Sequence, residues 1–482
     1  MVSLRSVAPT HRAMVVAVTV SMVAFLDSTV INLALTAIEH DLGGGLPLQQ
    51  WIVDGYLLTM AAAILPGGSI SDLFGRVPVM RFGLVVFGAG SVLGAVAASA
   101  EVLIAARLIQ GLGAAFLVPG SLALINTVFD KAHQSAAIGV WTAWTGTAFA
   151  LGPLLGGLCV DLLGWRWVFV LSAIPMAAGY ALTFWLCPVS GHVVGARVDV
   201  VGVVLSSVGL AATVFALIES QRRGWADLVV ATPAVLGVVA LSGFVGRQRR
   251  STQPLLPLSL FTVRNFTAVN LVTVFVYGAL TLGSLTVVLY AQEIGGYSAT
   301  AAGLATLPIP VMSFILARRV GRIAARTGPR MFLIAGPALS GLGMALVRLK
   351  DNGFHATTDL LPGMVVLALG LVLTVTPLTS MALASVPTEH SGLASAVNNA
   401  AARLAALVSV GSMGMITVGS TAAGFVNLLK VSAALFVLGS LCAAVWISDS
   451  LGGYGPVPCD LAASCRDRPG VQPALAEQSP PQ

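Results

Sequence analysis

Apolar residues occur along this chain in long blocks that short polar or Gly-rich segments separate. Fourteen blocks have roughly 18 to 25 residues, the length at which a helix rising 1.5 Å per residue crosses about 30 Å of hydrocarbon. They begin near residues 13, 51, 79, 102, 135, 166, 199, 228, 266, 300, 330, 360, 393 and 430. This pattern predicts an all-α polytopic membrane protein with 14 transmembrane helices.

The composition supports this prediction. Hydrophobic residues make up 57% of the 482 residues and charged residues 9%, against roughly 25% charged residues in soluble domains. A water-soluble protein of this length could not cover its surface with so little charge. The first block contains Asp27 and lacks a small-residue cleavage site, so we expect it to stay in the protein as a membrane span.

Basic residues are unevenly distributed among the segments between the blocks. An even number of spans places both termini on one side of the membrane, and 17 of the 25 Lys and Arg residues fall on that side, against six on the other. Because positive residues are retained in the cytoplasm, we expect both termini there, in a multi-pass protein of the cell (plasma) membrane.

A Gly-rich segment after the second block is repeated later in the chain. Gly68 and Gly321 are 253 residues apart, and so are Gly75 and Gly328. The repeat predicts two pseudo-symmetric six-helix bundles with an inserted helix pair, an organisation found in transporters, whose substrate path lies where the halves meet. The expected boundaries are 1–190 for the first bundle, 191–250 for the inserted pair, 251–450 for the second bundle and 451–482 for a disordered cytoplasmic tail.

Two charged residues lie inside apolar blocks. Asp27 is 13 residues into the first block and Arg107 is near the start of the fourth, so both fall about one third of the way from the same membrane face. Charges at this depth are rare unless they pair or line a cavity. One hypothesis is that Arg107 holds a cavity-lining Asp27 in its charged form until a proton or a cationic substrate displaces it. The alternative is a static ion pair that joins two helices.

Six motifs follow one another along the first six blocks. The segment after the second block reads Gly68-x-x-x-Asp72-x-x-Gly75-Arg76 and is followed by Arg81. The other five are Leu26-Asp27-Ser-Thr29-Val-Ile-Asn32, Trp51-Ile-Val-Asp54-Gly-Tyr56, Arg107-Leu-Ile-Gln110-Gly111, Gly146 with Gly152-Pro153-Leu-Leu-Gly156-Gly157, and Trp165-Arg166-Trp167-Val-Phe169. In this order they make the chain similar to the major facilitator superfamily, in its branch of fourteen-helix drug:proton antiporters, the antiseptic and methylenomycin-type efflux transporters.

This resemblance implies roles for three groups of residues. Proton coupling and substrate handling are implied for Asp27, Arg107, Asp54 and Gln110. A cytoplasmic gate loop that latches the halves together in the outward-open state is implied for Gly68, Asp72, Gly75, Arg76 and Arg81. An antiporter motif that seals against leak is implied for Gly146, Gly152, Pro153, Gly156 and Gly157.

Each role has a simpler alternative. Asp54 lies three residues past Trp51, near a membrane interface, where it would simply be solvated. Gly152 and Gly156 have the four-residue spacing that lets any two membrane helices pack closely. The Arg residues of the gate loop also set orientation. Acidic residues at the outer ends of the blocks are interpreted as surface charges: Glu39, Asp41, Glu101, Asp161 and Glu293.

The chain departs from the family pattern at several positions. Ala325 stands where Asp72 stands in the first copy, so a latch would be one-sided. Ser172 replaces the usual Asn after the sixth motif, and Arg403 is displaced by one position, about 100° around a helix. No acid lies inside the last six blocks, apart from Glu293 at an outer end, which favours neutral, amphiphilic or monocationic substrates over divalent cations.

Several function classes lack support in the sequence. No phosphate-binding Gly-x-x-x-x-Gly-Lys-Ser/Thr or His-Glu-x-x-His occurs, and the five Cys have no metal-ligand spacing. We therefore expect no enzyme activity, no metal or cofactor beyond a proton gradient, and no nucleic-acid partner. The expected function is a monomeric, proton-coupled antiporter in the lipid bilayer that exports small lipophilic or monocationic compounds. The alternatives are an uptake transporter or downhill facilitator of a small metabolite, and a channel or non-transporting membrane component.

Overall fold

The computed structural model describes residues 9–129, 131–186, 199–251, 254–350, 353–386, 391–417 and 422–448. Contacts join the chain up to Ile447 into one compact unit. The predicted tail, 451–482, lies outside the described residues.

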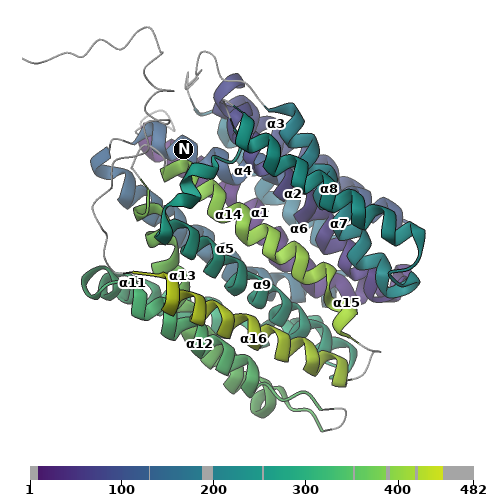
Figure 1. Cartoon of the computed structure of the whole chain (residues 1–482). Helices are drawn as coiled ribbons and strands as arrows, with labels where there is room; N and C mark the ends of the chain where they lie inside the picture. Colours follow the sequence, from purple (N-terminus) through teal and green to yellow (C-terminus); the bar gives the residue numbers. More distant parts are fainter. Residues whose placement is uncertain are drawn as a thin grey trace, which may run out of the picture. The chain divides into compact units, whose positions relative to one another are not determined.

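Within the described residues the structure is helical, without a strand (Figure 1). The first six long helices are α1 (Pro9–Leu42), α2 (Gly45–Phe74), α3 (Arg76–Ala95), α4 (Ala100–Val128), α5 (Lys131–Leu163) and α6 (Trp167–Thr183). Then follow α7 (Val200–Arg223), α8 (Leu228–Arg250), the 3-10 helix η2 (Leu258–Thr262), α9 (Arg264–Glu293), α10 (Ala299–Thr306), α11 (Pro308–Thr327) and α12 (Arg330–Leu346). The chain ends with the π-helical turn η3 (Ala356–Leu360), α13 (Leu361–Ala384), α14 (Ser391–Gly411), α15 (Met413–Ile416) and α16 (Ala422–Trp446).

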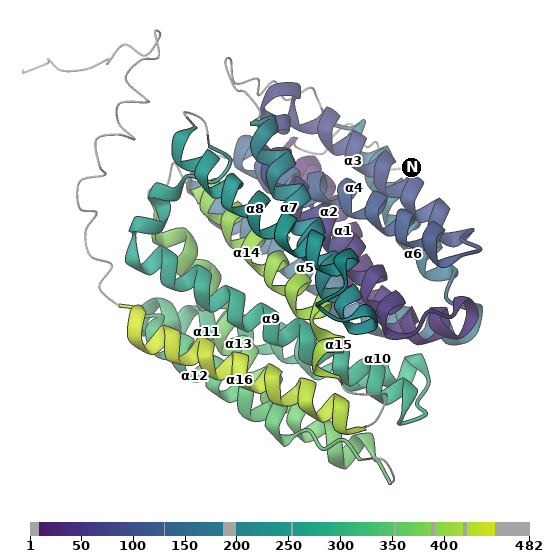
Figure 2. The same cartoon turned by 45° about the vertical axis from the view of Figure 1, so that its right-hand side comes forward.

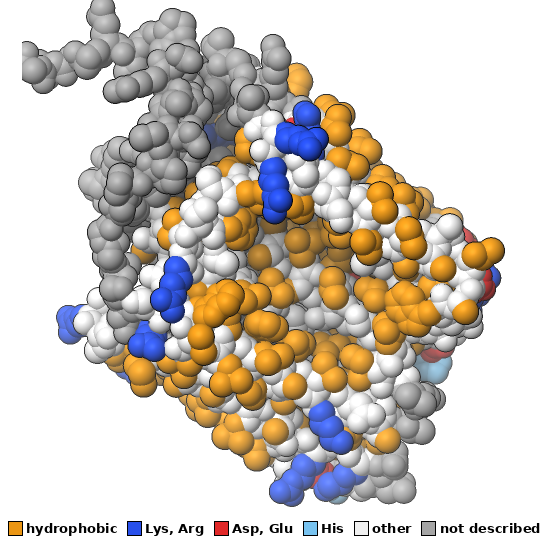
Figure 3. Space-filling view, viewed as in Figure 1, with side chains coloured by type: hydrophobic (Ala, Val, Ile, Leu, Met, Phe, Trp, Pro, Cys, Tyr) orange, Lys and Arg blue, Asp and Glu red, His pale blue; other side chains and the backbone are white. Residues whose placement is uncertain are grey.

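The helices have the length and composition of membrane spans. Among the described residues, ten are long and apolar enough to cross a bilayer, and three shorter segments are apolar as well. Large apolar side chains remain exposed on the outside of the molecule, for example Phe82 and Phe314. Figure 3 shows hydrophobic side chains over most of one face, with Lys and Arg mainly toward its edges. The prediction of an all-helical, multi-pass membrane protein is confirmed.

Two contacts define the ends of the helix array. At one end, Gln49 near the start of α2 hydrogen-bonds Glu293 at the end of α9. At the other, Arg264 at the start of α9 donates to the carbonyl of Val445 at the end of α16. We call the end at which α1 begins and α16 finishes the terminal end, and the opposite one the far end. We call α1–α6 the first set and α9–α16 the second set.

The Gly-rich segment between α2 and α3 is shorter than the sequence indicated. Helix α2 continues through the glycines as far as Phe74, and only Gly75 separates it from Arg76 of α3. Gly75 has φ 89° and ψ 145°, and Gly328, 253 residues later, has φ 91° and ψ 147°. A residue with a Cβ rarely adopts this φ. The short polar turn expected after the second block is thus reduced to a single residue, and the two copies share the same one-residue break.

Closely packed glycines recur at the same spacing in both sets. A Cβ added at Gly83 of α3 or at Gly336 of α12 would lie 2.9 Å from a carbonyl oxygen of the next helix. One added at Gly90 or Gly343 would lie 2.8 Å from such an oxygen. Both pairs are 253 residues apart, so α3–α4 and α12–α13 use the same small-residue packing.

The block predicted from residue 300 is divided in two. Helix α10 ends at Thr306 and α11 begins at Pro308, with Leu307 between them. Pro308 has no N–H to continue the hydrogen bonds of α10, and Pro310 removes a second one. The two prolines therefore explain the break between α10 and α11, which hydropathy alone does not reveal.

The two sets meet through a few helices. Helix α14 packs against α2 of the first set as well as against α9, and α5 packs against α10. Figures 1 and 2 show α14 between α9 and the pair α2 and α7. Helix α7 lies along α2, where the rings of Trp51 and Phe215 are 6.1 Å apart, and packs with α8 as a hairpin.

Candidate functional site

A buried ion pair lies at the centre of the first set. Asp27 of α1 is 0% exposed and Arg107 of α4 is 1% exposed, and their Oδ2 and Nη1 atoms are 2.7 Å apart. An unpaired charge in a protein interior costs several kcal/mol. Contact between Asp27 and Arg107 offsets the free-energy cost of burying each charge, the cost by which both residues stand out in the sequence.

Three further side chains complete the hydrogen bonding of this pair. Gln110 of α4 accepts from Arg107 Nη1 at 2.8 Å and donates to Asp27 Oδ1 at 3.4 Å and to Ser91 Oγ at 2.9 Å. Ser172 of α6 donates to Asp27 Oδ1 at 3.3 Å. The network therefore joins α1, α3, α4 and α6, and all five of its members are buried.

Helix α2 covers the guanidinium of Arg107. Arg107 Nε donates to the carbonyl of Ile52 at 3.0 Å, and its Cζ lies 4.5 Å from the ring centre of Tyr56. Gly111 faces the carbonyl of Tyr56, and a Cβ there would overlap it. Asp27 thus does not line an open cavity in this conformation. It is sealed between helices of one set.

Sequence reasoning missed two members of the network. In the sequence, Ser172 stands out only as a departure from an Asn, yet its hydroxyl reaches the carboxylate of Asp27. Ser91 belongs to none of the six motifs. Both are polar residues within apolar blocks, the one signal by which a sequence search could find them.

Asp54 lies deeper than its sequence position suggested. It is 0% exposed, and neither carboxylate oxygen has a hydrogen-bond partner within the described residues. A Cβ added at Gly411 of α14 would be 3.2 Å from Asp54 Oδ2. The alternative of a solvated interfacial charge is therefore wrong, because α2 is covered here by α14.

The antiporter motif of α5 packs against helices of both sets. Gly152 faces Thr29 of α1 so closely that a Cβ would overlap its hydroxyl, and Gly156 faces Val30. On the neighbouring face, a Cβ at Gly157 would lie 2.5 Å from Thr300 Cα of α10. Pro153 lies inside the continuous helix α5. The surroundings of Gly146 are outside the description. The close-packing interpretation thus holds for Gly152, Gly156 and Gly157.

The far end is closed by hydrogen bonds between the two sets. The carboxylate of Asp161, at the end of α5, accepts from the backbone N–H groups of Ala299 at 3.0 Å and Thr300 at 2.8 Å, the first residues of α10. Gln49 donates to Glu293 Oε1 at 2.8 Å, and Gln50 donates to the carbonyl of Val410 at 2.6 Å. We call these three contacts the far-end closure.

Three acids interpreted as surface charges therefore have specific partners. Asp161 and Glu293 bond across the two sets, whereas Asp41 pairs with Arg166 at 2.7 Å within the first set. Sequence position alone could not distinguish them, because the partners are 138 and 244 residues away for the first two.

Arg81, the last residue of the gate loop, lies on α3 and makes its described side-chain contacts within one set. Arg81 donates through Nε to Thr183 Oγ1 at 2.9 Å, and its Cζ lies 4.1 Å from the ring centre of Phe184. Arg76 begins α3 directly after Gly75. The side-chain surroundings of Gly68 and Asp72 lie outside the description. Arg81 thus joins α3 to the end of α6.

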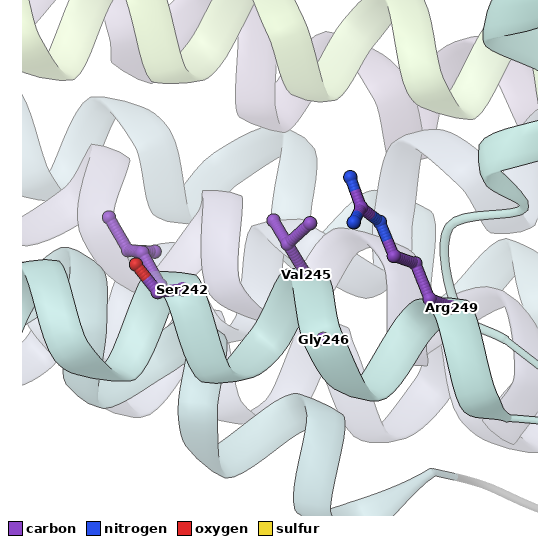
Figure 4. Close-up of a pocket in the computed structure, with 5 residues that line it drawn as sticks. Ser242, Val245, Gly246 and Arg249 are labelled. Atoms are coloured by element: carbon purple, nitrogen blue, oxygen red, sulfur yellow. The ribbon is translucent and has the colours of Figure 1, made fainter.

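Two hollows lie away from the buried pair. One of about 480 Å³ lies between α2, α4 and α7 and is lined mostly by apolar side chains such as Leu58, Leu112 and Val203. The other, about 430 Å³, is a shallow groove along α8, where Figure 4 shows Ser242, Val245 and Arg249 spaced along the helix. Neither hollow is lined by Asp27 or Arg107, which agrees with the sealing of the network.

Comparisons with known proteins agree with this arrangement. The chain is 35% identical over 424 residues to a puromycin resistance protein of Streptomyces alboniger, covering 85% of this chain and 82% of that one. It is 32% identical over 398 residues to a methylenomycin A resistance protein of Bacillus subtilis (strain 168), covering 82% and 85%. The fold resembles that of the xylose transporter XylE from E. coli, with a TM-score of 0.65 at 15% identity over 92% of this chain and 99% of that one. A family model matches residues 17–410, and the chain belongs to the Major Facilitator Superfamily.

Proposed function

We propose that this protein is a proton-coupled antiporter that exports small lipophilic or monocationic compounds by alternating access. Relatives that share about a third of its residues are named for resistance to puromycin and methylenomycin A. This similarity favours export over the alternative of uptake or downhill facilitation. The proton gradient is the proposed energy source, without a further cofactor.

The proposal includes a topology of fourteen spans. The described helices are compatible with fourteen crossings if α10 with α11, η3 with α13, and α14 with α15 each count as one. The spans then form bundles at 1–190 and 251–450 with the pair α7 and α8 inserted at 191–250. The charge bias supports a cytoplasmic terminal end and a far end on the outside, in a cell membrane. We propose that the monomer is the functional unit.

The observation that supports proton coupling best is the sealed contact between Asp27 and Arg107. While Asp27 is ionised, the two charges compensate each other. Protonation of Asp27 leaves the guanidinium of Arg107 unbalanced in a low-dielectric interior, a change of about 3–5 kcal/mol when one partner of such a pair is lost. About 5.5 kcal/mol converts a 1:99 equilibrium of two conformations into 99:1, so one proton is of the right size to favour the other conformation.

Gln110 and Ser172 fit this role because both can bond either form of Asp27. The amide and the hydroxyl donate to a carboxylate, and each also has an oxygen that can accept from a protonated acid. The network can therefore take up and release a proton without leaving Asp27 unbonded. Arg107, Gln110 and Ser172 are proposed to hold Asp27 in place during both states.

Asp54 is a proposed second proton site. A buried carboxylate without a partner costs several kcal/mol in its ionised form, so its neutral, protonated form fits this conformation. Because Asp54 is covered by Gly411 of α14, separation of the two sets at the far end would expose it to water. Its proton would then be released when the far end opens.

Measurements on inverted membrane vesicles test the proposal. Vesicles are acidified inside, and puromycin and methylenomycin A are added outside, each at increasing concentration. An exporter releases protons on addition of a substrate, whereas a downhill facilitator moves the compound without changing the internal pH, and a channel leaks before any compound is added. The proposal would be contradicted if neither compound caused proton release, or if vesicles that lack the protein also released protons.

A further inference from the structure

One basic residue in the middle of the helix array has no partner among the described residues. Arg403 lies on α14 and is partly buried, and it makes no hydrogen bond or ion pair with any residue that the structure describes. Arg107, the other basic residue at the centre of the array, makes three such bonds through its guanidinium. A cation inside a membrane protein without a partner in the protein indicates a functional site whose partner comes from elsewhere.

Arg403 is placed where the two sets meet. Its helix, α14, packs against both α2 and α9, and Arg403 lies within electrostatic range of Tyr56 of α2 and Tyr277 of α9, one from each set. Helix α14 is fixed against α9 close by, because Asn398 Nδ2 donates to Thr273 Oγ1 at 2.7 Å. Both views in Figures 1 and 2 show α14 between α2 and α9. Arg403 thus lies on a helix that contacts both sets, at the boundary where the proposed substrate path runs.

Tyr277 of α9, which lies within electrostatic range of Arg403, is a second donor. The hydroxyl of Tyr277 makes no hydrogen bond within the described residues and is not among the sealed polar atoms, so it keeps some accessible surface. Tyr56 differs, because its ring is covered by the guanidinium of Arg107 and its hydroxyl donates to the carbonyl of Ala24. Arg403 and Tyr277 together offer a charged and a neutral donor to one region.

No acid of the second set compensates Arg403 within the described residues. Glu293 bonds Gln49 at the far end, and Asp359 bonds Lys350 at 2.7 Å. In the first set, Asp27 is already neutralised by Arg107. Asp54, which faces Gly411 of the same helix α14, carries no charge in the protonated form proposed above for this conformation. The boundary between the sets therefore has a net positive charge, which repels cations and attracts anions.

We propose that Arg403 is a substrate-recognition residue that binds the anionic group of lipophilic weak acids, with the hydroxyl of Tyr277 as a second donor. This inference rests on the proposed export function and narrows its substrate class. A carboxylate pairs with the planar guanidinium through two parallel hydrogen bonds, and a phenolate accepts from the same N–H groups through its single oxygen. The apolar part of the compound lies against the surrounding helices. Monocationic compounds are disfavoured because they meet a like charge.

The test measures binding to the full-length protein in detergent by calorimetry, without a pH gradient. The probes are 1-naphthylacetic acid, its primary amide, which has the same shape without the charge, and 1-naphthylmethyl-trimethylammonium. The wild-type protein is expected to bind the acid at least tenfold more tightly than the amide or the cation. Equal affinity for acid and amide, tighter binding of the cation, or binding of none of the three would overturn the proposal.

Variants assign the preference to this residue. Arg403→Gln is expected to weaken binding of the acid at least tenfold and to leave the amide unchanged, which also shows that the variant is folded. Arg403→Lys keeps the charge and is expected to retain most of the preference for the acid. Arg319→Gln removes a charge from an exposed position on α11 and serves as the matched control. Loss of the preference in Arg319→Gln, or its retention in Arg403→Gln, contradicts the proposal.

The outcome is separate from that of the transport experiment. A protein that prefers the acid but releases no protons contradicts the coupling mechanism and leaves the role of Arg403 intact. A protein that exports with proton release but binds acid and amide alike contradicts only the role of Arg403.

Discussion

Removal of the carboxylate of Asp161 is expected to loosen the far-end closure. A helix leaves its first four N–H groups without partners inside the helix. In α10, Ser298 satisfies the amide of Ala301 through its hydroxyl and that of Ala302 through its carbonyl. The amides of Ala299 and Thr300 are bonded by Asp161 of the other set instead. These two amides therefore report whether α5 and α10 are in contact.

The size of the effect follows from the exposure of the contact. A carboxylate at a helix N-terminus contributes about 0.3–1 kcal/mol when solvent screens it, and hydrogen bonds to a charged group contribute about 1.5–3 kcal/mol when they are shielded. Asp161 is exposed, so we expect about 1 kcal/mol for Asp161→Ala. Since 1.4 kcal/mol is a factor of ten, the open fraction of this contact should rise about fivefold.

Hydrogen–deuterium exchange with mass spectrometry measures this directly in the peptide that contains Ala299 and Thr300. Asp161→Ala should exchange about five times faster there than the wild type, and Asp161→Asn should lie between the two because its amide oxygen still accepts. Asp41→Asn is the matched control, since it removes a far-end carboxylate whose partner, Arg166, lies in the same set. Unchanged exchange in Asp161→Ala, or an equal increase in Asp41→Asn, would refute the reasoning.

Three further predictions concern other contacts. Arg107→Met should lower the free energy of unfolding by about 3–5 kcal/mol because Asp27 is left without its partner, and the double variant with Asp27→Asn should recover part of this loss. Chemical denaturation measures both free energies. Equal values for the single and double variants would contradict a coupled pair. Gly157→Leu should stop transport while the protein remains in the membrane, because the added side chain would fill the space in which α5 contacts Thr300 of α10. Vesicle transport, normalised to the amount of protein in the membrane, measures the effect. Normal transport would show that the contact is dispensable. Burial opposes ionisation of Asp199, but hydrogen bonds from the Gly202 N–H, Arg247 and Gln248 outweigh this effect and hold the pKa of Asp199 below its ordinary 3.8. The ionised carboxylate therefore stabilises the α7–α8 hairpin above pH 3.8. This stabilisation is lost as the pH falls through the lowered pKa. The difference in melting temperature between wild type and Asp199→Asn should therefore shrink as the pH is lowered from 6 to 3, and a constant difference would contradict this.

The helices and the buried pair could be predicted from the sequence because each depends on a strong, local signal. Long apolar blocks cross membranes, and a charge inside such a block requires a partner. Asp27 and Arg107 stand out by that cost alone. Their contact at 2.7 Å follows from equal depth on neighbouring helices.

Other features depend on contacts between distant residues and could not be predicted. Asp54 is buried against Gly411 of α14, 357 positions later in the chain, and the partner of Asp161 lies on α10. The continuation of α2 through its glycines depends on packing, since a Cβ at Gly67 would lie 3.3 Å from the carbonyl of Ala115. Helical propensity alone argues for a turn at those glycines. Contacts with other helices reversed that local preference.

Exchange and pH-driven transport, compared in Asp27→Asn, test the coupling role of this residue most directly. The variant resembles the protonated acid, so it should still exchange labelled compound between the two sides of a vesicle at equal pH. It should fail to accumulate the compound when a pH gradient is imposed. Accumulation at the wild-type level in Asp27→Asn would show that the coupling proton binds elsewhere.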